Sequence, residues 1–485
     1  MDKKGKNVVV IGGGPGGYPC AVLLARSGFD TILVEKRALG GTCLQFGCIP
    51  SKTLINAAKR LKDLNDIRNT LMGDIPTIRY ADLIKHSREK VENITAGLDG
   101  IMKLNGVKVV KGRARFKDRK RVFVEKEDGA EEFSPDYVVI AVGSRARMLP
   151  GVPYPHERVL TNIEVLSATT PPEKLIIVGG GAIGCEFASF FSALNIPVTI
   201  IEHMSRLLPQ EDEDISRELQ TIFRKNGISV ITGRKVTKTD VSSDSVRITL
   251  DDQTVIEGSH ILVAIGIAPA TDDLGLEDAG IGVDERGYIP VRIPDYQVLK
   301  GPEGVYAIGD CISIPGRVHP CFAHVATREG EIVASVISGK PFDPLDYTNI
   351  PICTFTLPEV ARIGLTEDEA KKITCSAPAH EVLSVKVRYG ALGKGISLNH
   401  REGFIKIVEH RDKYHRKPIR QIAGAHIIGE GASELIHIIA ASRHAEDSIG
   451  HMKGILFQHP TWSELIGEAL RLLDDEAVHV RGRKP

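Results

Sequence analysis

Two buried strands that each lead into a cluster of glycines are the clearest feature of the hydrophobic pattern. Residues 8–12 (Val-Val-Val-Ile-Gly) and 175–178 (Leu-Ile-Ile-Val) show no alternation with polar side chains. Such runs are typical of parallel strands that are covered on both faces. Apolar residues at helical spacing follow each run, and a second β-branched run comes next, at 31–34 and 198–201. The pattern therefore predicts the same strand–helix–strand unit twice.

Glycines at the first strand–helix turn indicate a dinucleotide site. Gly12-x-Gly14-x-x-Gly17 opens the helix, and Glu35 ends the second strand, 18 positions past Gly17. In this arrangement the first glycine makes the tight turn, the second admits a pyrophosphate, and the third seats the helix on the sheet. Glu35 can accept hydrogen bonds from ribose hydroxyls. The full context favours this interpretation over an ordinary glycine-rich turn.

The second unit repeats the pattern with Gly179-x-Gly181-x-x-Gly184 and with Glu202, again 18 positions past its third glycine. Two fingerprints imply two dinucleotides, most simply FAD on the first and a nicotinamide on the second. A carboxylate at Glu202 would repel a 2′-phosphate, so NAD is favoured over NADP. Arg206 is a weak signal for NADP, although a solvated surface residue is the simpler interpretation.

A third segment, Val305-Tyr306-Ala307-Ile308-Gly309-Asp310, is a short apolar strand that ends in a carboxylate. Asp310 could bind the hydroxyls of a flavin's sugar-alcohol chain. By itself the segment could equally be a strand followed by a turn.

Two cysteines lie between the first unit and the rest of the chain. Cys43 and Cys48 are five positions apart, which matches neither a C-x-x-C motif nor zinc spacing, so no metal site is predicted. Helical spacing of apolar residues follows from Leu54, which places Cys48 near a helix N-terminus, where a thiolate is stabilised. The alternative is that the two cysteines only fill the hydrophobic core, and the flanking glycines make this a poor interpretation.

His459 is the candidate base near the end of the chain. It precedes Pro460, which indicates an extended or turn segment, and an amphipathic helix follows from about Leu465. Glu464 lies in the first turn of that helix and could orient the imidazole. A His–carboxylate pair is the minimum for proton transfer near pH 7, although a purely structural histidine remains an alternative.

Composition narrows the function classes. Lys plus Arg and Asp plus Glu both number 62, and this neutral balance argues against nucleic acid or an anionic membrane as partner. No apolar stretch approaches the roughly 20 residues of a membrane span. Eight cysteines in 485 residues do not make a disulfide scaffold. These features predict a cytoplasmic, multidomain protein.

Four segments resemble those of a known family: GGTCLQFGCIPSK (40–52), GGGAIGCE (179–186), VYAIGD (305–310) and HPTWSE (459–464). In this order they resemble the FAD-dependent pyridine nucleotide–disulfide oxidoreductases, and the similarity covers about residues 6–472. With the preference for NAD, the cysteine segment is most similar to the dihydrolipoamide dehydrogenase branch.

The resemblance implies an α/β fold with two Rossmann-like domains, for FAD and NAD, and an α+β C-terminal dimerisation domain. The FAD-binding domain would comprise 1–147 and 276–346, the NAD-binding domain 148–275, and the interface domain 347–485. A homodimer is implied, because the family's His–Glu pair serves the cysteines of the partner subunit.

The resemblance also implies roles for the reactive residues. Cys43 would be the interchange thiol that faces the substrate, and Cys48 the thiol against the flavin, with the two joined as a disulfide in the oxidised state. His459, held by Glu464, would take the proton of a substrate thiol. The resulting thiolate would attack Cys43, since thiolates are the nucleophiles in disulfide exchange.

Further cofactor contacts follow from positions that match the family. For FAD these are Lys52, Gly143 and Ala323, and for NAD they are Glu186 and Gly266. The chain departs from the family's pattern at Ile267, where the usual residue is Arg, and at Trp462, where it is Leu. In Arg388–Leu392 the Ala-Asn-x-Arg-Ala stretch of the interface domain is altered.

These features together predict NAD-dependent oxidation of dihydrolipoamide or of a lipoyl-bearing protein, within an oxo-acid dehydrogenase or glycine-cleavage complex. One alternative is an NADH-dependent reductase of another low-molecular-weight disulfide, for which Trp462 and the altered interface leave room. A second alternative is a flavin- and NAD-binding redox sensor or complex subunit without turnover.

Overall fold

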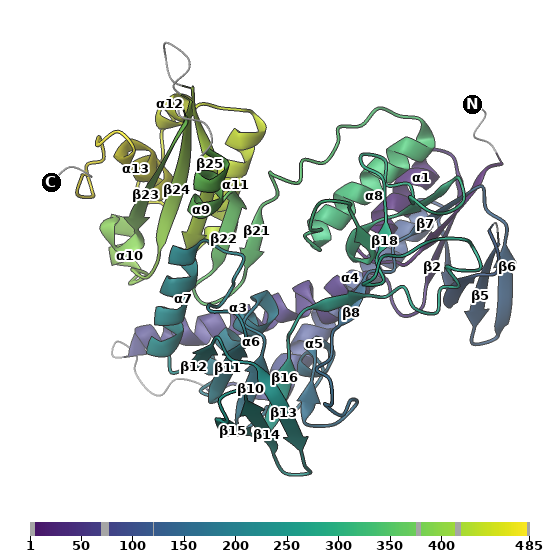
Figure 1. The fold of residues 1–485 in the computed structure, drawn as a ribbon, viewed down its shortest axis with the longest axis horizontal. Helices are drawn as coiled ribbons and strands as arrows, with labels where there is room; N and C mark the ends of the chain where they lie inside the picture. The colour runs from purple at the N-terminus through teal and green to yellow at the C-terminus, as the bar shows by residue number, and fades with distance from the viewer. Residues whose placement is uncertain (1–4, 69–76, 120, 375–379, 413–418, 483–485) are drawn as a thin grey trace.

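The computed structural model describes the chain except residues 1–4, 69–76, 120, 375–379, 413–418 and 483–485. Its three large sheets form separate regions in Figure 1, the first in purple and green, the second in teal and the third in yellow-green. No helix among the described residues has both the length and the apolar character needed to cross a membrane.

The first large sheet is parallel and has the strand order β19-β7-β1-β2-β3. The Val-rich strand β1 lies at its centre, pairs with β2 and β7, and has Val8, Val9 and Val10 fully buried. The strands and the two helices that pack together on this sheet are β1 (Asn7–Ile11), β2 (Asp30–Glu35), β3 (Lys108–Lys111), β7 (Tyr137–Ile140), β19 (Val305–Ala307), α1 (Gly17–Arg26) and α8 (Ala323–Ser338).

The second large sheet repeats this plan with the order β12-β11-β10-β16-β9. Its central strand β10 has all four residues buried, because helices and a second layer cover both faces. The elements are β9 (Val159–Leu160), β10 (Leu175–Val178), β11 (Val198–Glu202), β12 (Ser229–Thr232), β16 (His260–Val263), α5 (Asn162–Val165), α6 (Ala182–Ala193) and α7 (Glu213–Lys225).

Each parallel sheet carries a three-stranded antiparallel sheet in its crossover connection, from β3 to β7 in the first unit and from β12 to β16 in the second. The strands are β4 (Arg113–Phe116), β5 (Val122–Lys126), β6 (Gly129–Phe133), β13 (Val236–Val241), β14 (Val246–Leu250) and β15 (Val255–Gly258). Short pairs join β8 (Ser144–Ala146) to β17 (Ile267–Pro269) and β18 (Ile289–Pro290) to β20 (Ile312–Ser313).

Helices interrupt the first unit between β2 and β3. They are α2 (Gly41–Phe46), α3 (Cys48–Asp66) and α4 (Tyr80–Leu104). The second unit has only α7 at the equivalent place, between β11 and β12. Both predicted cysteines lie in the helical insertion of the first unit.

The third large sheet is antiparallel, with the order β21-β22-β25-β24-β23. Its strands and helices are β21 (Ile352–Thr354), β22 (Val360–Gly364), β23 (His380–Arg388), β24 (Phe404–Asp412), β25 (Ile419–Ile428), α9 (Glu367–Thr374), α10 (Gly393–Ser397), α11 (Ala432–His444), α12 (Ile449–Lys453) and α13 (Glu464–Leu472). Two parallel α/β units and this mixed C-terminal region confirm the predicted fold class.

Buried ion pairs join the second unit to the third sheet. Lys406 on β24 is 3% exposed, and its ammonium lies 2.9 Å from Asp212 and 2.8 Å from Asp214. Arg362 on β22 lies 3.0 Å from Glu211. Because removing one partner would leave an uncompensated buried charge, these pairs fix the second unit against the C-terminal region.

Candidate active site

The two cysteines meet where two helices join. Cys43 lies in α2, Cys48 is the first residue of α3, and Gly47 separates them. A Cβ added to Gly47 would lie 3.2 Å from the Cα of Cys43, so glycine permits the close turn. Both thiols are free, and a hydrogen bond joins Cys43 to Cys48.

The pair is electrostatically unequal. The hydrogen bond from Cys43 and the ammonium of Lys52 outweigh burial and lower the pKa of Cys48 from 9.0 to about 7. The same hydrogen bond, together with burial, raises the pKa of Cys43. Of the two thiols, Cys48 is therefore the one that ionises more readily, as its place at a helix N-terminus favours.

Lys52 reaches from α3 to the second unit. Its ammonium lies 2.8 and 3.0 Å from the two carboxylate oxygens of Glu186 and 4.5 Å above the ring of Phe355. Glu186, on α6 and 7% exposed, also accepts a hydrogen bond from the amide of Phe355 at 2.9 Å. A fixed cation and a fixed carboxylate thus lie beside Cys48, where the two units meet.

The first fingerprint is packed tightly at two glycines and open at one. A Cβ on Gly12 would lie 2.3 Å from the carbonyl oxygen of Ala141, and one on Gly17 would lie 1.8 Å from that of Gly12. A Cβ on Gly14 would find nothing closer than 3.8 Å. The turn therefore leaves room at the position where a pyrophosphate would approach, which fits FAD.

The acid at the end of β2 is held by backbone amides. Glu35 accepts hydrogen bonds from Gly13 at 2.8 Å and from Arg37 at 2.9 Å, one on each oxygen. Each oxygen keeps a second lone pair, so the carboxylate is oriented and still able to accept from ribose hydroxyls.

Asp310 lies three residues past β19, in a short 3₁₀ turn, and accepts a hydrogen bond from Ser144 at 2.9 Å. Burial raises the pKa of this carboxyl. A half-buried carboxyl with one partner among the described residues has capacity for ligand hydroxyls, which fits the proposed contact with the flavin.

The remaining flavin-side candidates lie at chain turns. Gly143 has φ +68 between β7 and β8, and Ala323 is the first residue of α8. The free N–H groups of such a helix start suit an electron-rich group.

The second fingerprint repeats the geometry of the first. Added Cβ atoms would lie 2.2 Å from the carbonyl oxygen of Ala264 at Gly179 and 2.0 Å from that of Gly179 at Gly184, whereas Gly181 has nothing within 4 Å. The residues therefore fit a second dinucleotide. Gly266, which has φ +111 and open space around it, follows β16 in the same unit.

Glu202 is held as Glu35 is. It accepts from the amides of Gly180 at 2.6 Å and Met204 at 2.7 Å and is 6% exposed. Arg206 is not simply solvated, because its guanidinium donates to the carbonyl oxygen of Pro209 at 3.1 Å. This contact holds Arg206 in its own loop.

His459 and Glu464 form a pair. Nδ1 of the imidazole lies 2.9 Å from Oε1 of Glu464, while Oε2 accepts from the amide of Thr461 at 2.9 Å. Partial burial by itself would raise the pKa of Glu464, but these two contacts outweigh burial and lower it. The imidazole is 73% exposed. Among the described residues, no hydrogen bond or ion pair joins it to either cysteine of its own chain.

Sequence reasoning missed three neighbours of the site. Phe355 packs against Lys52, Ser144 bonds Asp310, and Tyr18 lies close enough to Cys43 that the thiol helps to raise the pKa of the phenol, after burial. Tyr18 directly follows Gly17, which could have drawn attention to it. The other two carry no signal in the sequence.

Comparison with known proteins decides the family. Residues 6–330 match the family described as "Pyridine nucleotide-disulphide oxidoreductase", and residues 350–470 match its dimerisation domain. The chain belongs to this family. Its members are flavoprotein oxidoreductases that use FAD and NAD(H), the two cofactors predicted from the paired fingerprints.

Curated relatives of this oxidoreductase span nearly its whole length. Dihydrolipoyl dehydrogenase of Bacillus subtilis is 36% identical over 98% of this chain and 99% of its own. The protein of the same name from Haloferax volcanii is 32% identical over 99% and 98%.

Solved structures of similar oxidoreductases show the same fold. LpdA from Mycobacterium tuberculosis superposes with a TM-score of 0.85 at 26% identity, covering 96% of this chain and 99% of its own. The HOCl-induced flavoprotein disulfide reductase RclA from Escherichia coli gives 0.83 at 26% identity, covering 96% and 100%.

Proposed function

We propose that this enzyme oxidises dihydrolipoamide, free or carried by a lipoyl-bearing protein, and passes the electrons to NAD. The observation that carries the proposal is the unequal thiol pair, in which Cys48 has a lowered pKa beside the Lys52–Glu186 ion pair. Several relatives that match over nearly their full length are named dihydrolipoyl dehydrogenase, which supports the choice of substrate.

In the oxidised enzyme, Cys43 and Cys48 form the disulfide. His459 removes a proton from one substrate thiol, and the thiolate attacks Cys43, which releases Cys48 as a thiolate. The second substrate thiol then displaces Cys43 as the substrate disulfide closes. The substrate loses two electrons, and the cysteine pair gains them.

Glu464 orients the imidazole, and Lys52 stabilises the Cys48 thiolate that is released. FAD and NAD, when bound, supply the acceptor for the two electrons. Glu35, Asp310, Gly14, Gly143 and Ala323 would hold the first cofactor, and the second would be held by Glu202, Gly181 and Gly266.

We infer that two chains build each site, with His459 of one subunit serving the cysteines of the other. The exposed imidazole supports this inference, as does the run that leads to it, in which Leu456 is 95% exposed and Ile455 40%. A partner subunit would cover such side chains. We assign 1–147 and 276–346 to the FAD domain, 148–275 to the NAD domain and 347–485 to the interface domain, and we expect a cytoplasmic enzyme.

A second candidate is reduction of another disulfide by NADH. The structural likeness to RclA favours it, as does Trp462, which packs 5.0 Å from the ring of Tyr389 next to the His459 loop. An indole there changes the shape of the surface that a substrate meets.

One assay separates the two candidates. Purified holoenzyme is given dihydrolipoamide with NAD⁺, or NADH with lipoamide, oxidised glutathione, cystine or cystamine. The proposal expects dihydrolipoamide oxidation to have the highest kcat/KM. Negligible turnover of dihydrolipoamide, with rapid reduction of another disulfide, would overturn it.

A further inference from the structure

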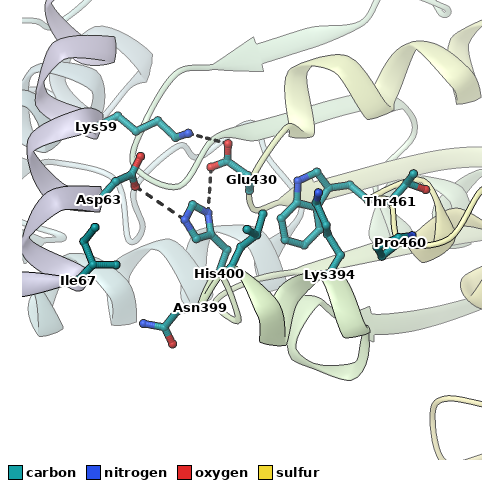
Figure 2. A pocket seen from close by; sticks show the side chains of 11 residues that line it. Lys59, Asp63, Ile67, Lys394, Asn399, His400, Glu430, Pro460 and Thr461 are labelled. Atoms are coloured by element: carbon teal, nitrogen blue, oxygen red, sulfur yellow. Dashed lines mark hydrogen bonds and ion pairs between the residues drawn. The ribbon is translucent and has the colours of Figure 1, made fainter. Parts of the chain in front are cut away.

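A pocket of about 640 Å³ lies between α3 and the C-terminal region, directly beside the His459 loop (Figure 2). Pro460, Thr461 and Trp462 form one wall, and α3 forms the other. Whatever part of a substrate extends beyond the dithiol at His459 has this space next to it.

The ionisable residues at the back of the pocket satisfy one another. Lys59 lies 2.6 Å from Glu430, and His400 lies 3.3 Å from Glu430 and 3.7 Å from Asp63. Figure 2 shows these four side chains as one connected chain from α3 to the C-terminal region. Lys59, the lysine of this group, therefore already has a carboxylate partner.

Lys394 is different. It lines the same pocket from α10 and is half-buried, and within the described part of the chain it has no carboxylate partner. Its neighbour Gly393 lies against the imidazole, since an added Cβ would be 3.6 Å from Cε1 of His459. Along the chain, a lysine without a carboxylate partner among the described residues thus directly follows a glycine that lies against the candidate base.

Apolar surface accompanies this charge. Trp462 and Leu398, the latter 47% exposed, line the pocket together with Lys394. A hydrocarbon chain that ends in a negative group matches such a lining, because the chain removes apolar surface from water and the end group pairs with the ammonium.

We propose that this pocket binds a carboxylate that the substrate carries beyond its dithiol, and that Lys394 selects for its charge. The inference rests on the proposed function, since it places the dithiol end of the same molecule at His459. The carboxylate belongs either to the free acid, at the end of its acyl chain, or to an acidic side chain beside the lipoyl group of a carrier.

The test compares charged and neutral ligands on the holoenzyme dimer. KM is measured for dihydrolipoate and dihydrolipoamide, and calorimetry measures the binding of octanoate and octanamide, which cannot react. We expect K394M to raise the KM of dihydrolipoate and the Kd of octanoate by about five- to tenfold, with the neutral ligands changed less than about twofold. K394R should retain the preference. K300M, which removes an exposed lysine outside the pocket, serves as the matched control.

Equal binding of octanoate and octanamide to the wild-type enzyme would overturn the proposal, as would equal weakening of both by K394M. If neither dithiol is oxidised, the proposed function fails, and octanoate binding still decides the pocket. Lipoyl-lysine peptides flanked by Glu or Gln identify the source: a Lys394-dependent preference for Glu indicates a carrier side chain, and its absence, with dihydrolipoate still selected, indicates the free acid.

Discussion

The two nucleotide-binding units have the same strand order, the same three-stranded crossover sheet and similar close contacts at their first and third glycines, yet only the first carries the cysteine pair. The difference lies in the connection after the second strand. There the first unit inserts α2, α3 and α4 with both cysteines, and the second has α7. We therefore infer that each fingerprint holds a dinucleotide and that the insertion of the first unit supplies the thiol chemistry.

The two units are also held in the molecule by different contacts. The fifth strand of the first sheet, β19, comes from a distant segment and brings Asp310, whereas the fifth strand of the second, β9, immediately precedes that unit. The second unit is instead held to the C-terminal region through Lys406 and Arg362. Two units with the same sheet order thus differ in the segments and ion pairs that are attached to them.

The largest expected effect is the loss of disulfide turnover while flavin reduction by NADH is kept, which would separate the roles of the two units. Cys43→Ser should abolish disulfide turnover by at least about 10⁴-fold, because the attacked sulfur is gone. Reduction of the bound flavin by NADH, which depends on the second unit, should stay within about twofold. Stopped-flow absorbance of the flavin measures its reduction by NADH, and steady-state assays measure disulfide turnover. Cys20→Ala, a buried cysteine on α1, is the control. Loss of both activities would contradict the division of roles.

His459→Gln should slow the thiol half-reaction by about 10²–10⁴-fold, since general base catalysis contributes this much. Rapid mixing with dihydrolipoamide and with NADH resolves the two halves. Glu464→Gln should give a smaller loss through poorer orientation of the ring. If the NADH half slowed equally, the imidazole would have no specific role in thiol chemistry.

The fixation of the second unit can be tested through pH. His426 on β25 is fully buried, and burial lowers the pKa of its imidazole to about 4, while Asp212, Arg362 and Lys406 face it. An unfolded histidine titrates near 6.5, so the folded state loses stability as the pH falls from about 6.5 towards 4. The full effect is about 3 kcal/mol. Denaturant unfolding gives the free energy of unfolding of the wild type and of His426→Phe as a function of pH. This loss of stability between about pH 6.5 and 4 should occur in the wild type and be absent from the variant, and parallel profiles would contradict the role given to His426.

The smallest effect concerns the matched acids Glu35 and Glu202. Glu202→Ser combined with His203→Arg should shift the kcat/KM ratio of NADH to NADPH by about 10- to 100-fold towards NADPH, because repulsion of a 2′-phosphate becomes attraction. Glu35→Ser should leave that ratio unchanged and instead weaken flavin retention. An unaltered ratio in the double variant would discredit the ribose contact of Glu202.

Much of the scaffold could be predicted because it is local. The strands expected at 8–12 and 198–202 are β1 and β11 to within one residue, and the helix after the first glycines is α1. By contrast α2 went unpredicted, because six residues between glycines give no helical period. The contact between Lys52 and Glu186 spans 134 positions, and only the family resemblance suggested it. The Lys406 cluster had no signal at all, since charged residues look solvated until a fold buries them together.

The interrupted arrangement of the first sheet has a consequence for biosynthesis. Its edge strand β19 pairs with β7, which ends at Ile140, although β19 itself begins only at Val305. A ribosome must therefore release the entire intervening unit before this sheet can close, and the intervening unit has all its own strands available earlier. Such long-separation pairing is slow. In newly made chains the second, nicotinamide-binding unit should thus fold first. FAD should bind only after β19 has completed the first sheet.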